Sequence, residues 1–177
     1  MILLVVDMQP NFRSSNHRWL LDGVAREVRA AKTAGWGVMF LEYTSGINCG
    51  VRAGVLLKER THRRLTDLVA DYDDAMTVHK GQDDGSDAVL SAAEGWWGSK
   101  SGSECERHID GGIRVVGVNT EACVASTVNG LSAARPDLEI TVVGGACNSG
   151  GKGPNNDGHD LIVTKGRNIR VLAAVVA

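Results

Sequence analysis

The stretch GIRVVGVNTEACVAST, residues 112–127, joins a strand pattern directly to a helix pattern. Residues 113–116 are mostly apolar and β-branched, which predicts a buried strand. Over residues 121–134 the apolar residues recur at helical spacing, and Thr120 is a suitable N-cap for that helix. The stretch therefore predicts a strand-to-helix joint that places Cys123 in the first helical turn.

The same alternation of strand and helix extends along the rest of the chain. Helical spacing lies between apolar runs, most clearly at residues 20–31, and further strands are predicted at residues 2–6, 37–41, 75–80, 138–143 and 169–172. Strands that are apolar on both faces predict a parallel sheet covered on both sides. We therefore expect a single α/β domain over residues 1–177, a three-layer Rossmann-like sandwich of about six mostly parallel strands with helices on both faces.

Composition and charge narrow the function classes. The formal net charge is −2, so neither nucleic acid nor a membrane surface is an expected partner. The apolar start of the chain is short and lacks a basic segment, so it predicts a strand rather than a signal peptide. No apolar run reaches the roughly 18 residues of a membrane span, and we expect a cytoplasmic protein. The four cysteines form no Cys-x-x-Cys pair, so no disulfide framework is expected.

Three residues that can do chemistry follow predicted strands, namely Asp7, Lys80 and Cys123. Sites in parallel α/β sheets lie beyond the carboxyl ends of the strands, so we expect these side chains to meet there. Together they would supply a nucleophile, a base and a charge partner. Alternation along the strand places His79 on the other face from Lys80, and no other histidine is suitably placed, so a Cys-His pair is not predicted.

Each of these residues also has a structural interpretation. Cys123 fits a small hydrophobe packed under a helix, Asp7 fits a cap of the following turn, and a lysine at a strand end is commonly exposed. If Cys123 does lie in the first helical turn, the helix dipole would lower its pKa from ~8.5 toward ~6.5 and favour the thiolate.

Three sequence features together resemble the isochorismatase-like cysteine hydrolases, a family that includes nicotinamidases and N-carbamoylsarcosine amidases. They are DMQPNF at residues 7–12, the strand-terminal Lys80, and GVNTEACVAST at residues 117–127. The resemblance implies a Cys-Asp-Lys triad in which Asp7 is the general base and Lys80 holds that aspartate. Cys123 would then attack a carbonyl and form a thioester that water hydrolyses.

The resemblance carries three further implications. It implies a cis peptide bond between Val118 and Asn119. It also implies that the backbone amides of Asn119 and Cys123 stabilise the oxyanion. Members of the family assemble as homo-oligomers, so the resemblance implies a dimer or a tetramer.

The sequence departs from the family pattern in places that bear on the substrate. Nicotinamidases bind a metal through Asp-x-His and a further histidine after the second strand, but residues 42–54 read EYTSGINCGVRAG, with no histidine before His62. We therefore expect no metal and no other cofactor, and nicotinamide is disfavoured. Gly145 replaces an aspartate that relatives often carry, and Cys147 is interpreted as a buried structural thiol. The nearby GACNSGGKG lacks residues that a phosphate-binding loop requires, so nucleotide is not expected.

The candidates for substrate binding are Phe12, Asp83, Trp96 and Trp97. After Lys80 many relatives have a segment ending in an aromatic that walls the pocket, but residues 81–90 read GQDDGSDAVL here. Asp83, with its neighbour Asp84, could therefore face a polar or cationic substrate or could simply be solvated. The two tryptophans could line the pocket or anchor a loop.

The sequence thus predicts a metal-independent cysteine hydrolase that acts on a small molecule with an amide or related C–N bond. Because Cys123 is present, hydrolysis of isochorismate itself, a vinyl ether, is disfavoured. The alternative is a catalytically silent protein that keeps the fold for binding or as a scaffold, an alternative that the long glycine-rich loops leave open.

Overall fold

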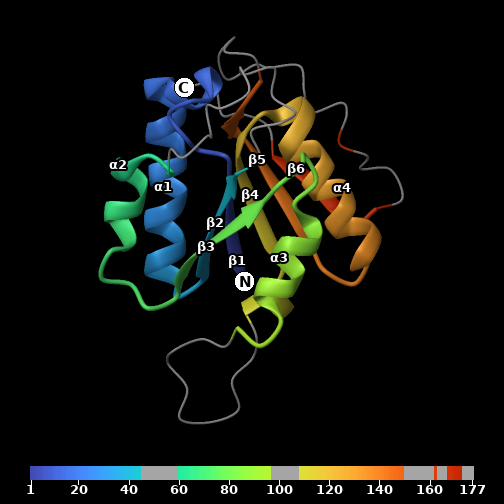
Figure 1. Ribbon diagram of the computed structural model, residues 1–177. Helices are drawn as coiled ribbons and strands as arrows, with labels where there is room; N and C mark the ends of the chain where they lie inside the picture. The colour runs from blue at the N-terminus through green and yellow to red at the C-terminus, as the bar shows by residue number, and fades with distance from the viewer. Residues whose placement is uncertain (45–59, 97–107, 150–161, 163–166, 173–177) are drawn as a thin grey trace.

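Six parallel strands form one sheet in the computed structural model, in the order β3-β2-β1-β4-β5-β6 (Figure 1). The structure describes residues 1–44, 60–96, 108–149, 162 and 167–172. The strands are β1 (Ile2–Val6), β2 (Gly37–Tyr43), β3 (Ala75–Lys80), β4 (Ile113–Val118), β5 (Ile140–Asn148) and β6 (Ile169–Leu172). The α/β class predicted from the alternating patterns is confirmed.

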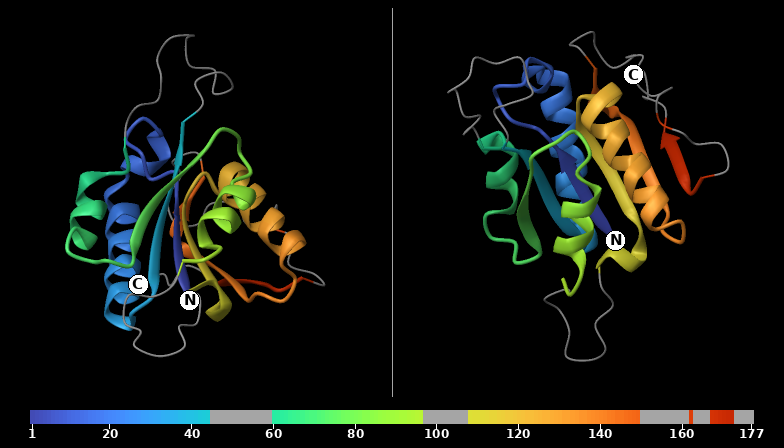
Figure 2. Two further views of the ribbon diagram at one scale, coloured as in Figure 1. Left: turned by 60° about the horizontal axis from the view of Figure 1, so that its bottom comes forward. Right: turned by 45° about the vertical axis from the view of Figure 1, so that its right-hand side comes forward.

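Helices cover both faces of this sheet, so the molecule has three layers. They are α1 (Arg18–Ala34), α2 (Arg63–Thr66), α3 (Ser86–Ala93) and α4 (Ala125–Ala134). Figures 1 and 2 show α1 and α2 on one face of the sheet and α3 and α4 on the other. Short 3₁₀ turns lie at Arg13–Asn16, Asp67–Val69 and His108–Gly111, and a single π-helical turn, Thr120–Val124, precedes α4.

The central strand β1 is buried along its whole length, which explains its uninterrupted apolar sequence. Its odd-numbered residues Leu3 and Val5 pack with residues of α1 such as Val24. Its even-numbered residues, including Leu4, pack with α3 and α4 on the other face. The alternation follows from the two-residue period of a strand, and it gives the sheet one apolar cluster on each side.

The predicted bounds of β5 were too short at the carboxyl end. We predicted a strand that stops at residue 143, because the following Gly144-Gly145 is typical of a loop. The strand instead continues to Asn148, and its pairing with β4 shifts register between Val115 and Gly117. This irregularity lets the two glycines remain within the sheet, so GACN belongs to a strand end and not to a loop.

No helix among the described residues is both long enough and apolar enough to cross a membrane. Of residues 42–54, which depart from the nicotinamidase pattern, those from 45 onward lie outside the described residues. The same holds for residues 150–153 at the end of GACNSGGKG, and for Trp97.

Candidate functional site

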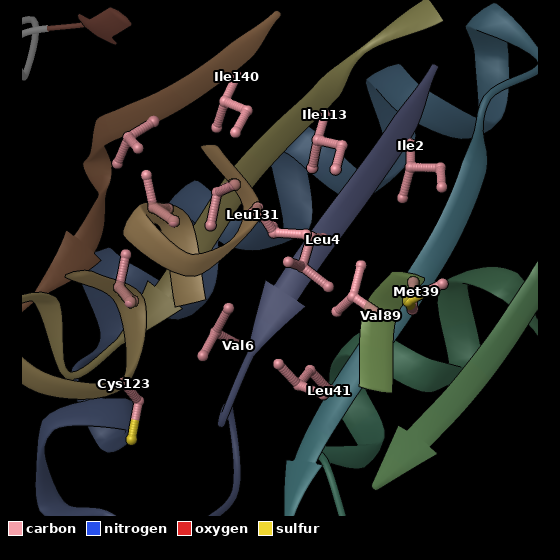
Figure 3. Packing of buried hydrophobic residues seen from close by; sticks show 14 of the residues in the cluster. Ile2, Leu4, Val6, Met39, Leu41, Val89, Ile113, Cys123, Leu131 and Ile140 are labelled. Carbon is pink, nitrogen blue, oxygen red and sulfur yellow. The ribbon is translucent and has the colours of Figure 1, made fainter. Parts of the chain in front are cut away.

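The carboxyl ends of β1, β3 and β4 bring the three predicted residues together. Figure 3 shows Cys123 at the end of β1 where Val6 and Leu41 lie, while Ile2 is at the opposite end. Asp7 follows β1 directly and Lys80 is the last residue of β3. The three residues come from separate parts of the sequence, and the parallel topology alone makes them neighbours.

Asp7 is buried and held in an uncommon backbone conformation. Its φ is +49°, in the left-handed region that aspartate tolerates better than most residues. Its amide still donates to the carbonyl of Leu41 at 2.8 Å, which continues the ladder with β2 by one residue. The amide of Gln9 then donates to the Asp7 carbonyl at 2.8 Å, so the chain turns away immediately after the carboxylate. These contacts fix the direction of the Asp7 side chain.

Lys80 forms an ion pair with Asp7 inside the protein. Its Nζ lies 3.0 Å from Asp7 Oδ2, and the two side chains are 1% and 0% exposed. Burial raises the pKa of the Asp7 carboxyl above its ordinary value, and the charge of Lys80 acts against that rise. A carboxylate whose pKa is raised by burial is a stronger base than a solvated one, which suits proton abstraction near neutral pH.

Cys123 lies in the π-helical turn, where it is only 4% exposed. Burial raises the pKa of its thiol well above the ordinary value, the charge of Asp7 raises it further, and Lys80 lowers it. The predicted lowering of this pKa by a helix dipole is therefore wrong for the resting site, where the thiol keeps its proton. Thr120 is not the N-cap either, because it is the first residue of the turn and Asn119 precedes it without a side-chain capping bond.

The segment before Cys123 is anchored from two sides. The peptide bond between Val118 and Asn119 is cis. The Asn119 side-chain oxygen accepts a hydrogen bond from the Ser14 hydroxyl, and Asn148 at the end of β5 donates to the Ser14 carbonyl at 2.8 Å. The Asn119 carbonyl accepts from the amides of Ala122 and Val124, the two neighbours of Cys123.

Gly117 allows β4 to approach the end of β1. Its φ is +125°, and a Cβ atom at this position would lie 2.1 Å from the Val6 carbonyl oxygen. Only glycine fits both the conformation and the space. The close approach sets the height of the turn that carries Cys123 relative to Asp7.

Asp83 extends over the thiol from the solvent side. The Cys123 Sγ donates to its Oδ1 at 3.6 Å, and the Asp83 side chain is exposed. Its neighbour Asp84 does not face the thiol, since it accepts a hydrogen bond from the amide of Ser86 at the start of α3. The structure thus separates two adjacent carboxylates that the sequence could not distinguish.

Aromatic residues line the other side of the ion pair. The Tyr43 ring lies 5.6 Å from Lys80 Nζ, and Phe12 meets Tyr43 edge-on with centroids 6.3 Å apart. Gln9 fixes Tyr43 by bonding both its amide and its carbonyl, at 2.8 and 3.1 Å. Sequence reasoning missed Gln9 and Tyr43, although Gln9 lies within the quoted motif and Tyr43 extends the second strand by two residues.

Trp96 does not line this site. It packs edge-on against His108, with ring centroids 5.1 Å apart, and its ring limits the space beside Gly37. Gly37 begins β2, so Trp96 lies at the amino end of the sheet, opposite the thiol. Trp96 therefore packs against His108 and β2 at that end, and the pocket-lining alternative is wrong for it. Trp97 lies outside the described residues.

His79 and Cys147, two further titratable residues of the sheet, have contacts that explain them structurally. His79 is half-exposed and lies 3.6 Å from Glu42, on the other face of β3 from Lys80. Burial raises the pKa of the Cys147 thiol to about 12, as fits a packed thiol. Within the described part of the chain, no group of three or more His, Cys, Asp or Glu is placed to hold a metal ion.

Comparisons with known proteins agree with this architecture. A family model, the isochorismatase domain, matches residues 1–169. No curated protein sequence matches the chain. Among solved structures, the nicotinamidase from Staphylococcus aureus has a TM-score of 0.62 at 19% identity, with 96% of each chain covered. The nicotinamidase from Bacillus subtilis has a TM-score of 0.64 at 17% identity, covering 96% of this chain and 97% of that one.

A structure described as a ribonuclease is equally similar. The MAR1 ribonuclease from Caenorhabditis elegans has a TM-score of 0.64 at 16% identity, covering 98% of this chain and 76% of that one. Likeness at such low identity shows the fold and not the activity. The family model, which spans nearly the whole sequence, shows more, and by that match the chain belongs to the isochorismatase family.

Proposed function

We propose that this protein is a cysteine-dependent hydrolase of a small amide or a related C–N bond. The observation that carries the proposal is the buried ion pair of Lys80 and Asp7 beside the Cys123 thiol. Burying two charges is costly, and apolar residues of similar volume often stabilise a core as well or better. A buried ion pair therefore indicates a purpose beyond stability. A base held ready next to a nucleophile is such a purpose.

The reaction begins with the thiol protonated and Asp7 ionised. As Cys123 Sγ attacks the substrate carbonyl carbon, Asp7 takes the thiol proton and the carbonyl electron pair moves to oxygen. When that pair returns, the C–N bond breaks and the leaving nitrogen takes the proton from Asp7. The result is a thioester on Cys123 and a free amine or ammonia.

Water completes the cycle by the same route. Asp7 removes a proton from water as its oxygen attacks the thioester carbonyl, and the proton passes to sulfur when the C–S bond breaks. Lys80 keeps its charge throughout and offsets whichever negative charge is present, on the carboxylate or on the sulfur. The products are a carboxylic acid and the resting thiol.

The oxyanion is assigned to the backbone amides of Asn119 and Cys123. The hydrogen bonds around the turn support this assignment. The Asn119 carbonyl accepts from the amides of Ala122 and Val124, and the Cys123 amide between them is not one of its donors. Backbone donors fixed before the reaction need no reorganisation when charge develops on oxygen.

An ammonia-release screen over small carboxamides and carbamoyl compounds tests the proposal. We expect at least one compound to be hydrolysed, and Cys123→Ser to reduce the rate by about a thousandfold or more. Cys147→Ser is the matched control, since this thiol is also buried but belongs to strand β5, and it should retain activity. If turnover is the same in Cys123→Ser, Cys123 is not the nucleophile and the proposed mechanism is wrong. If no compound is hydrolysed, the catalytically silent binding protein becomes the better account.

A further inference from the structure

The loop that links β3 to α3 places a third charged group at the thiol. Asp83 Oδ1 accepts from Cys123 Sγ at 3.6 Å, and Asp83 is exposed whereas the Asp7–Lys80 ion pair is buried. The charge of Asp83 also contributes to the raised pKa of Asp7, so the two carboxylates are close enough to influence each other. The thiol therefore lies near two carboxylates, the buried Asp7 and the exposed Asp83.

Hydrogen bonds to its carbonyl hold the backbone of Asp83, while its exposed side chain accepts from the Cys123 thiol and can be reached by a ligand. Lys80 Nζ donates to the Asp83 carbonyl oxygen at 2.9 Å, and the Thr127 hydroxyl donates to it at 3.3 Å. Thr127 lies one helical turn beyond Cys123 and also accepts the Gly85 amide at 3.0 Å. Since these bonds use the main chain, a change of the Asp83 side chain leaves them in place.

The negative charge of Asp83 destabilises the thiolate form of Cys123. A carboxylate near a sulfur disfavours the thiolate, and Lys80 opposes that effect in the resting site. A positive group on the substrate would reverse this effect, because it would neutralise Asp83 when the substrate binds and when the thiolate must form. The short distance to the sulfur requires that group to lie within a few bonds of the carbonyl carbon.

We propose that Asp83 is a specificity-determining residue that selects substrates carrying a protonated amine one or two carbons from the scissile carbonyl. The inference rests on the proposed function, since it assigns the substrate class of that same site. The ammonium group binds the Asp83 carboxylate, and the carbonyl carbon then lies over the sulfur. Substrates with a carboxylate at the same position are repelled.

Charge-matched thiol reagents test the inference without a known substrate. The methanethiosulfonates with aminoethyl, methyl and sulfonatoethyl groups are cationic, neutral and anionic, and each forms a mixed disulfide with Cys123 while methanesulfinate leaves. Rates at Cys123 are read by peptide mass spectrometry at low salt. We expect Asp83→Asn to lower the ratio of cationic to anionic rates by about tenfold, and Asp83→Lys to invert it.

Asp87→Asn is the matched control. It removes the same charge as Asp83→Asn, but from an exposed carboxylate on α3. Its rate ratio should stay at the wild-type value. If the ratio in Asp83→Asn also stays there while Cys123 still reacts, the inference about Asp83 is wrong and the proposed nucleophile stands. If Cys123 reacts no faster than Cys147 even with the neutral reagent, the proposed function fails and this inference with it.

A second test compares three amides of similar size, 3-aminopropanamide, butanamide and succinamate. Wild type should give the highest kcat/KM for the cationic amide and the lowest for the anionic one. Asp83→Asn should reduce kcat/KM for the cationic amide by about tenfold and leave that for butanamide within about twofold. Equal loss for all three amides would show a structural effect of Asp83 and overturn its role in selection.

Discussion

At the scale of single residues, the site depends on how Asp7 and Cys123 share a proton. Asp7 is fully buried at the end of β1, and burial raises the pKa of its carboxyl. The charge of Asp7 in turn raises the pKa of the Cys123 thiol, while Lys80 lowers it. The proton therefore stays at the site until a substrate gives the sulfur an electrophile to attack.

Asp7→Asn should separate the two effects of this carboxylate on Cys123. Removing the negative charge of Asp7 removes one of the causes that raise the thiol pKa, while Lys80 still lowers it, so the pKa of the thiol falls. The pH at which iodoacetamide labels Cys123 at half its maximal rate should move down, while ammonia release should drop by about a thousandfold or more because the leaving nitrogen has no proton donor. A midpoint that moves up or does not move would show that Asp7 does not act on the thiol.

Sequence reasoning found the three residues of the site but not their electrostatic state. Asp7 and Cys123 come after strands and Lys80 ends one, and their residue types alone indicate chemistry. The direction of the Cys123 pKa shift was missed because it depends on burial and on a partner that is distant in sequence. Neither quantity follows from the position of a cysteine in a helical turn.

At the scale of elements, β1 and β3 hold opposite charges on either side of β2. The ion pair between Asp7 and Lys80 closes over the end of β2, where Tyr43 lies level with Lys80 in the strand register. Because each of these buried charges has the other as its main partner, removing one should destabilise the protein more than removing both would suggest.

Double-mutant analysis of Asp7→Asn and Lys80→Met should reveal strong coupling. Each single variant leaves one buried group without its partner and should lower the free energy of unfolding by about 3–5 kcal/mol. The double variant should be clearly more stable than the sum of the two losses predicts, and it should be inactive. Denaturant unfolding measures the three differences.

The exposed ion pair of Lys32 and Asp71 provides the comparison cycle. Its members lie on the surface, so the coupling measured with Lys32→Met and Asp71→Asn should be much smaller. Additive losses for Asp7→Asn and Lys80→Met would contradict the view that the two buried charges stabilise each other.

Gly117→Ala should disturb the joint between β4 and the turn that carries Cys123. A Cβ atom would meet the Val6 carbonyl oxygen at 2.1 Å and would also require a positive φ, so the free energy of unfolding should fall by about 2–4 kcal/mol. Gly95→Ala is the control, because Gly95 also has a positive φ but has no atom within 4 Å of the added carbon. Equal losses in the two variants would show that the contact with Val6 is not what matters.

The elements also show where sequence patterns stop being informative. Apolar runs predicted the inner strands β1 and β2 most clearly, because a parallel sheet buries both faces of such strands. The end of β5 was missed because Gly144-Gly145 is typical of a loop, and only the register shift against β4 keeps it within the sheet. Likewise, the π-helical turn at Cys123 has no known sequence signal that differs from that of an ordinary helix.

At the scale of the whole molecule, the sheet brings together residues that lie far apart in the chain. The order β3-β2-β1-β4 puts the ends of the first, third and fourth strands along one edge, and the family match covers residues 1–169. The fold was predictable because it follows from local patterns and strand direction. Which of two adjacent carboxylates, Asp83 or Asp84, faces the thiol was not, since it depends on how the loop meets α4.

The most direct test of the central claim is to trap the thioester on Cys123. Enzyme mixed with a hydrolysed amide is quenched in acid within one turnover, digested, and examined by mass spectrometry for the acyl mass on the peptide that contains Cys123. The account predicts an acyl adduct that forms on Cys123 and not on Cys147, and that is absent in Asp7→Asn. Turnover without any adduct on Cys123, at undiminished rate in Cys123→Ser, would contradict it.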